Sequence, residues 1–124
     1  MKILLASPER DLLECYKTLL QSDVGEVVTA FDGAQVLSLI NAEKFDIAVL
    51  DTELPRVQYG VLLEKIKEKN VASVAMINEA ESVRKLKNEP RADAYLQYPF
   101  GYGRIKSVIT ETLDKARKGR GKNE

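Results

Sequence analysis

The chain has 124 residues, 44% of them apolar, which suffices for one domain with a hydrophobic core and no disulfide staples. Its 19 basic and 19 acidic residues cancel, so charge gives no argument for nucleic acid or an anionic membrane surface as a partner. Cys15 is the single cysteine, and the chain has no histidine. These counts exclude an intrachain disulfide, Ser/His/Asp and Cys/His catalysis, and histidine metal sites. The first apolar run is too short for a signal peptide and no run is long enough to cross a membrane, so we expect a cytoplasmic protein.

Short apolar runs alternate with longer stretches of helical period along the chain. The pattern predicts five strands, in the residue ranges 3–6, 27–30, 47–50, 74–77 and 94–97. Runs this apolar are typical of strands buried on both faces, as in a parallel sheet that helices cover. The (βα)₅ order therefore predicts an α/β fold with a doubly wound, five-stranded parallel sheet.

The stretches between and after these strands predict the helices. Ser7 and Pro8 have the pattern of a helix N-cap and first helical residue, followed by a helix to about Ser22 with Cys15 buried or half-buried in it. A short polar helix is expected over residues 80–88. The positions expected to face the sheet from the second, third and last helices are Val36, Leu37, Ile40, Leu62, Leu63, Ile66, Ile105, Val108, Ile109 and Leu113.

We expect residues 1–113 to form the domain and residues 114–124 to form a basic, disordered tail. The tail carries five basic residues, and glycines separate the last of them. Such an end is usually solvated, so nucleic-acid binding is the less favoured interpretation of it.

Polar or aromatic side chains follow four of the predicted strands. Ser7 follows the first, Asp51 the third, Asn78 the fourth and Tyr98 the fifth. In doubly wound sheets ligands bind at the carboxyl ends of the strands, near the point where the strand order reverses. This rule places a candidate site among these four residues.

Two segments resemble the receiver domains of two-component response regulators. Residues 45–55 have the sequence FDIAVLDTELP, and residues 92–100 have ADAYLQYPF. The similarity covers about residues 2–113 and implies a flavodoxin-like receiver fold and a signalling module rather than an enzyme. In the family, an aspartate after the third strand, four residues before a proline, accepts a phosphoryl group. Asp51 and Pro55 match that pattern.

The chain departs from the family where a metal ion is expected. The family has two adjacent acids after the first strand that help to hold Mg²⁺, and Ser7 and Pro8 stand there instead. Glu9 is one position too late, and the first helical turn would have to unwind to bring it in. Asp51, Glu9 and the Glu53 carbonyl are the weak candidates that remain, so we expect no metal site and no cofactor. Mg²⁺ would be needed only if the site were active.

Two further family positions are also altered. Asn78 stands where the family has serine or threonine, and Tyr98 stands where it has a lysine that pairs with the phosphoryl oxygens. A phenol supplies no fixed positive charge at neutral pH. Because phosphoryl transfer depends on positioning and charge stabilisation, we expect Asp51 to react slowly, if at all. Three interpretations of Asp51 stay open: an active phosphoacceptor, a relic of a former phosphoacceptor, or a structural carboxylate.

Tyr95, Tyr98, Phe100 and Tyr102 lie close together, and such a group of aromatics favours a protein interface. Tyr95 aligns with the family's switch aromatic, although a half-buried tyrosine on an edge strand explains it as well. Tyr98 either donates a hydrogen bond into the site, imitating an activated state, or lies at an interface, which we favour slightly. The resemblance also implies a cis peptide bond between Tyr98 and Pro99.

Three functions remain open. The favoured one is a pseudo-receiver that binds a signalling protein without phosphorylation, through the fourth and fifth strands and the last helix, with a homodimer as one arrangement. The second is a conventional receiver that a histidine kinase phosphorylates on Asp51. The third, a small flavodoxin-like ligand-binding protein, is opposed by the lack of a glycine-rich phosphate loop after the first strand.

Overall fold

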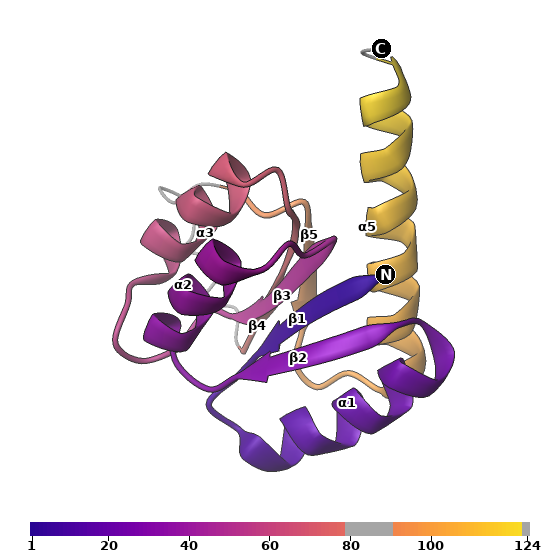
Figure 1. Ribbon diagram of the computed structural model, residues 1–124. Coiled ribbons are helices and arrows are strands. Elements are labelled where there is room, and N and C mark those ends of the chain that lie inside the picture. The colour runs from indigo at the N-terminus through magenta and orange to yellow at the C-terminus, as the bar shows by residue number, and fades with distance from the viewer. Residues whose placement is uncertain (79–90, 123–124) are drawn as a thin grey trace.

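The computed structural model describes residues 1–78 and 91–122 (Figure 1). Its strands are β1 (Lys2–Ala6), β2 (Glu26–Ala30), β3 (Ile47–Asp51), β4 (Ala72–Ile77) and β5 (Ala94–Gln97). Its helices are α1 (Arg10–Asp23), α2 (Gly33–Ala42), α3 (Tyr59–Glu68) and α5 (Tyr102–Lys122). The helix expected over residues 80–88 lies outside the described residues. None of the described helices is long and apolar enough to span a membrane.

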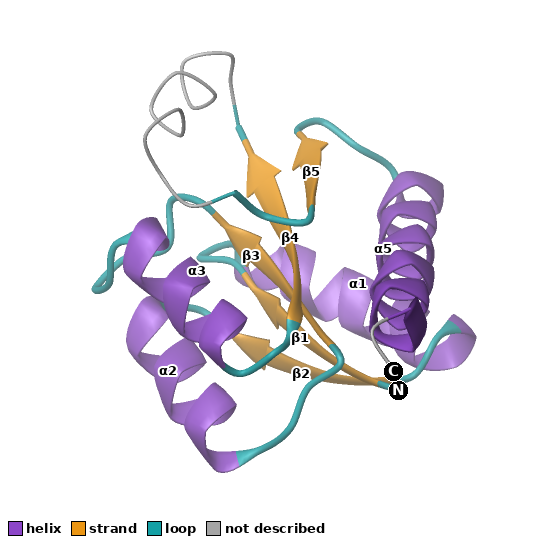
Figure 2. Ribbon diagram, turned by 90° about the horizontal axis from the view of Figure 1, so that it is seen from above, coloured by secondary structure: helices purple, strands orange, loops and turns teal. Residues whose placement is uncertain are grey.

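All five strands run parallel in one sheet, in the order β2-β1-β3-β4-β5, which confirms the predicted doubly wound fold. Helices α2 and α3 cover one face, and α1 and α5 cover the other (Figure 2). Each face carries its own hydrophobic cluster, because side chains alternate between the two sides of a strand. The predicted core positions of the helices are buried, except that Leu37 is half-buried.

The first helix begins later than its sequence pattern predicts. Glu9, in an extended conformation, is the residue before α1, and the helix starts at Arg10. The Ser7 hydroxyl instead accepts a hydrogen bond from the Glu9 backbone N–H at 3.1 Å. Ser7 and Pro8 therefore form a turn ahead of the helix, and no helical turn has to unwind to release Glu9. Cys15 is exposed, contrary to the prediction, because Leu13 and Leu20 make the buried stripe of α1.

The last helix extends past the domain boundary predicted at Leu113. α5 continues to Lys122, so the segment expected to be disordered is helical over most of its length. Ala116 packs against the core cluster that includes Leu113. The apolar stripe thus continues one turn further than the larger side chains indicate, and residues 114–122 are helical rather than disordered, while the domain boundary at Leu113 stays a prediction.

Gly33 lets the start of α2 lie directly against the loop that follows the candidate site. Its N–H donates to the Pro55 carbonyl at 2.9 Å, and a Cβ atom at this position would lie 2.6 Å from Val57 Cβ. The glycine is thus required by the contact between α2 and this loop. Asp32 caps the same helix by accepting the Gln35 N–H at 2.8 Å, and its carboxylate pairs with Arg56 at 3.3 Å.

We expect Gly33→Ala to lower the free energy of unfolding by about 1–3 kcal/mol, because the added methyl overpacks this contact. Gly103, in the first turn of α5, has no atom within 4 Å of an added Cβ and is the matched control. Gly103→Ala is expected to stabilise the protein by up to about 1 kcal/mol through helix propensity. Urea denaturation of both variants measures the difference. Equal effects of the same sign would show that the Val57 contact does not decide the outcome.

Candidate functional site

The carboxyl ends of β1, β3 and β5 bring Ser7, Asp51 and Tyr98 together. Asp51 is the last residue of β3, and register places it opposite Met76 of β4. Ser7 follows β1, and its N–H donates to the Ala30 carbonyl at 3.0 Å. Tyr98 follows β5 and reaches back over the sheet, so its hydroxyl lies 3.5 Å from Met76 Sδ. The site thus lies on the edge of the sheet where the predicted residues were expected.

The Asp51 carboxylate is buried, with 6% of the residue exposed, and both of its oxygens accept hydrogen bonds. Oδ1 accepts from the Glu53 backbone N–H at 2.8 Å, and Oδ2 accepts from the Tyr98 hydroxyl at 3.2 Å. A neutral phenol therefore bonds the carboxylate from the position where the family resemblance implies a lysine ammonium. The Tyr98 hydroxyl thus donates a hydrogen bond into the site, as the first of its two interpretations predicts, and a place for its half-buried ring at an interface stays a prediction.

Burial raises the pKa of the Asp51 carboxyl above its ordinary value. The hydrogen bonds from Glu53 and Tyr98 act in the opposite direction, while the negative charges of Glu53 and Glu9 raise it further. Burial, followed by the charge and hydrogen bond of Asp51, raises the pKa of Tyr98 well above its ordinary range. Tyr98 therefore stays protonated at neutral pH and acts as a hydrogen-bond donor to the carboxylate.

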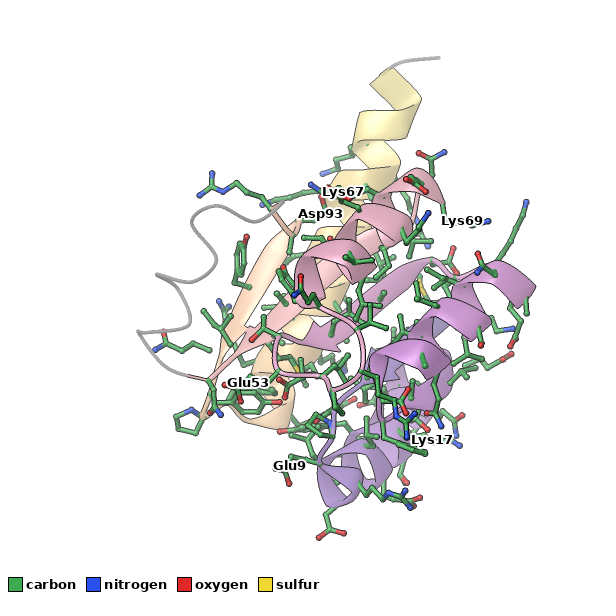
Figure 3. All side chains as sticks on the ribbon, turned by 90° about the vertical axis from the view of Figure 1, so that its left-hand side faces the viewer. Glu9, Lys17, Glu53, Lys67, Lys69 and Asp93 are labelled. Atoms are coloured by element: carbon green, nitrogen blue, oxygen red, sulfur yellow. The ribbon has the colours of Figure 1, made fainter. Side chains whose placement is uncertain are left out.

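The residues around Asp51 do not fit a magnesium site. Mg²⁺ requires anionic or carbonyl oxygens in near-octahedral geometry. Ser7 is fully buried and its hydroxyl is engaged by Glu9 and Tyr98, while Pro8 has no side-chain oxygen. Glu9 and Glu53 are exposed, and in the described part of the chain no three His, Cys, Asp or Glu side chains gather closely enough to hold a metal ion. Figure 3 labels Glu9 and Glu53 at this end of the molecule.

Asn78 lies at the rim of the site rather than in it. The residue is exposed, and its amide donates to Glu53 Oε2 at 3.4 Å. Asn78 therefore helps to position Glu53, the residue whose backbone N–H binds Asp51.

A row of aromatic rings connects the site to α1 and α5. The Tyr98 ring lies 4.7 Å from Phe100, Phe100 lies 5.9 Å from Tyr16, and Tyr16 lies 6.4 Å from Tyr102. The Tyr16 hydroxyl donates to the Phe100 carbonyl at 3.1 Å. Tyr98, Phe100 and Tyr102 are half-buried and their rings pack in this row, and the assignment of the group to a protein interface stays a prediction. No sequence signal groups Tyr16 with the others, since it belongs to α1, far away in the chain.

Tyr102 ends this row with a contact to the last turn of α1. Its hydroxyl donates to Asp23 Oδ2 at 2.6 Å and lies 3.1 Å from the Leu19 carbonyl. Partial burial, followed by the hydrogen bond and charge of Asp23, raises the pKa of Tyr102 to about 12. The peptide bond between Tyr98 and Pro99 is cis, as the resemblance predicts.

Tyr95 is half-buried on the edge strand β5. Its ring packs against the cluster formed by Tyr59, Leu63, Ala75 and Ala92, and its hydroxyl accepts the Ala92 N–H at 3.2 Å. This placement is compatible with both interpretations of Tyr95, as a switch residue and as a plain edge-strand tyrosine.

Comparison with known proteins gives a family match over most of the chain. Residues 3–110 match the family model described as the response regulator receiver domain. The regulatory protein VanRc of Enterococcus gallinarum is 30% identical over 101 residues, which cover 80% of this chain and 44% of that protein. The transcriptional regulatory protein CpxR of Escherichia coli K12 is 31% identical over 114 residues, covering 87% of this chain and 49% of that protein. The chain thus spans about half the length of these relatives.

Solved structures agree with the fold. A CheY-like receiver domain protein from Methanospirillum hungatei superposes with a TM-score of 0.82 and 27% identity, covering 95% of this chain and 97% of that one. A structure described as adenylate cyclase from Rhodopirellula baltica has a TM-score of 0.85 at 21% identity, covering 98% of this chain and 93% of that one. At that identity the second likeness supports the fold alone.

Proposed function

Because the chain belongs to the response regulator receiver domain family, we propose that it is a two-component signalling module that binds a protein partner without phosphorylation of Asp51. The observation that carries this proposal is the hydrogen bond from the Tyr98 hydroxyl to Asp51 Oδ2. In this proposal the module is not an enzyme and uses no cofactor.

The physical argument rests on charge. A phosphorylated aspartate adds negative charge, which a metal ion and a cation must offset for the reaction to proceed. Here the nearest groups are two further acids, Glu9 and Glu53, and both disfavour added negative charge at Asp51. Tyr98 contributes a hydrogen bond but no positive charge. Arg10 and Arg56 are directed elsewhere, since Arg10 stacks on Phe31 and Arg56 pairs with Asp32.

In this proposal the Tyr98 hydrogen bond holds the site in one state and takes the place of phosphorylation. The partner would then recognise a constant surface of this chain, formed by β4, β5 and the start of α5. That partner is either another signalling protein or a second copy of the chain. The rings of Tyr98, Phe100 and Tyr16 would make this surface rigid, because they connect the site to α1 and the start of α5.

The test is binding of beryllofluoride, a phosphoryl mimic, in the presence of Mg²⁺, followed by amide NMR shifts. We expect no saturable shifts at Asp51, Asn78 or Tyr95 in the wild-type protein, and the same spectrum for Asp51→Asn. Saturable shifts that Asp51→Asn abolishes would refute phosphorylation-independent action.

One observation favours the second candidate, a conventional receiver that a histidine kinase phosphorylates. Glu9 is extended and precedes α1, and its charge already acts on Asp51. A modest movement of Glu9 toward Asp51 would add one acid to the site. The same beryllofluoride titration discriminates the two candidates, because Glu9→Gln would weaken binding only if Glu9 served as a ligand.

A further inference from the structure

A second candidate site lies at the amino-terminal edge of the sheet, on the opposite side of the molecule from Asp51. A groove of about 860 Å³ is enclosed there by the C-terminal end of α2, the loop before β3 and the loop between α3 and β4. This volume is within the range of known ligand sites. The residues that line it are Ile40, Asn41, Ala42, Glu43, Lys44, Phe45, Asp46, Lys69, Asn70 and Val71.

The two acids of this groove are already engaged by one residue, Lys2. The Lys2 ammonium pairs with Glu43, and the Lys2 backbone N–H donates to Asp46 Oδ2 at 2.7 Å. The same ammonium lies 3.6 Å from Glu26 and 5.4 Å from the centre of the Phe45 ring. The Lys2 ammonium therefore offsets the charge of Glu43, whereas the bond to Asp46 comes from a neutral N–H group.

The lysines of the groove, in contrast, have no such partners. Lys44 and Lys69 are exposed, and so is Lys67 one turn back on α3; none of the three forms an ion pair with another residue of ranges 1–78 and 91–122. Figure 3 shows Lys67 and Lys69 at the end of α3, on the side of the molecule away from Glu9 and Lys17. The ammonium groups that a ligand would meet in this groove are thus available.

Stabilisation of helix C-termini explains only part of the placement of these lysines. A helix C-terminus carries partial negative charge and favours nearby lysines. The last carbonyls of α3 are, however, already bonded, since the N–H groups of Lys69 and Val71 donate to the Ile66 carbonyl at 3.2 Å. Lys44 lies in the loop after α2 and Lys69 in the loop after α3, so two separate segments each place a lysine in the lining of one groove. A stabilising role at a helix end does not require that arrangement.

We propose that this groove binds an acidic segment of a partner protein. Glutamate or aspartate side chains would pair with Lys44 and Lys69, and Lys67 would extend the positive surface along α3. The amide of Asn41 can bond the peptide backbone, and Ile40, Phe45 and Val71 provide an apolar floor. The neutral net charge of the chain disfavours nucleic acid, which usually requires a large basic excess.

The test is a titration of the full chain with a short oligoglutamate peptide, monitored by amide NMR shifts at low ionic strength. We expect shifts at Asn41, Lys44 and Lys69, and an affinity that falls as salt is added. Lys44→Glu and Lys69→Glu should each weaken binding by about tenfold. Lys17→Glu, which makes the same charge change on α1, is the matched control and should leave the affinity within about twofold.

Three outcomes would overturn the proposal: no binding of oligoglutamate, equal effects of Lys17→Glu and Lys69→Glu, or tighter binding of a single-stranded oligonucleotide at the same residues. The result is independent of phosphorylation, since the groove and Asp51 lie at opposite edges of the sheet. A beryllofluoride experiment that refutes the proposed function would leave this inference standing, and the reverse also holds.

Discussion

Asp51 is expected to become a working phosphoacceptor when Ser7→Asp, Pro8→Asp and Tyr98→Lys are combined. The first two changes supply the acids that the family resemblance implies for Mg²⁺, and the third supplies a cation in place of the Tyr98 phenol. Removing one group of this kind from a phosphoryl-transfer site costs roughly a hundredfold in rate. We therefore expect the triple variant to incorporate phosphate from acetyl phosphate at least about a hundredfold faster than the parent.

The partial variants separate the two contributions. Tyr98→Lys alone supplies charge without a metal site, and Ser7→Asp/Pro8→Asp alone supplies acids without a cation, so each should react far more slowly than the triple variant. Adding Asp51→Asn to the triple variant should abolish incorporation. Mass spectrometry of the intact protein measures the phosphorylated fraction.

A separate measurement shows whether the triple variant folds as intended. Ser7→Asp and Pro8→Asp add two carboxylates near Asp51, and the single cation from Tyr98→Lys does not offset all three, which destabilises the fold. We expect its melting temperature to rise when Mg²⁺ is added, while that of the parent does not. A triple variant that Mg²⁺ stabilises but that remains unreactive would refute the explanation that Asp51 is slow because the acids and the cation are missing. A parent that reacts at the same rate as the triple variant would also refute it.

The features that the sequence predicts well depend on local pattern. Residues 47–50 form an apolar run bounded by polar residues, and such a run is a buried strand in almost any packing arrangement. The parallel order then follows from the alternation of strands and helices. The position of Asp51 at the carboxyl end of β3 needs nothing further, so the centre of the candidate site was predictable.

The features that the sequence does not predict depend on contacts between distant segments. Tyr98 points into the site because Phe100 and Tyr16 support its ring, and Tyr16 lies on α1. The start of α1 was misplaced because Pro8 suits both the first turn of a helix and the turn before it. The continuation of α5 past Leu113 depends on Ala116 contacting the core, and no local signal in a basic, glycine-spaced sequence indicates that contact.

Tyr98→Phe is expected to lower the free energy of unfolding by about 1.5–3 kcal/mol at neutral pH, because it removes a hydrogen bond to a buried carboxylate. The ring and its packing on Phe100 remain, so the change isolates the hydroxyl. Tyr16→Phe is the matched control, since it also removes one hydroxyl, from a bond to the Phe100 carbonyl. Its cost should be smaller, about 0.5–1.5 kcal/mol, because a neutral acceptor is involved.

The pH dependence gives the sharper test. The folded protein holds the pKa of Asp51 above its ordinary value, so the native state favours the protonated acid. Stability associated with Asp51 is therefore fully present below the unfolded pKa and is lost as pH rises through the folded pKa. Tyr98 opposes this shift, so Tyr98→Phe should raise the pKa of Asp51 further and make the total loss of stability larger. The cost of Tyr98→Phe should thus shrink as pH falls, whereas that of Tyr16→Phe stays constant.

Asp51→Asn completes a double-mutant cycle with Tyr98→Phe. An asparagine removes the buried charge, its oxygen can accept the Glu53 N–H, and its amide can donate to the Tyr98 hydroxyl. We therefore expect Asp51→Asn to stabilise the protein at neutral pH and to have less effect as pH falls and the acid of the parent becomes protonated. In the Asp51→Asn background, Tyr98→Phe should cost less than in the parent and show no pH dependence. If Tyr98→Phe costs the same free energy of unfolding in both backgrounds at every pH, the phenol stabilises the fold through Met76 or Ser7 and not through the carboxylate. The tyrosine that stands in place of the family's lysine would then have no bearing on the charge of Asp51.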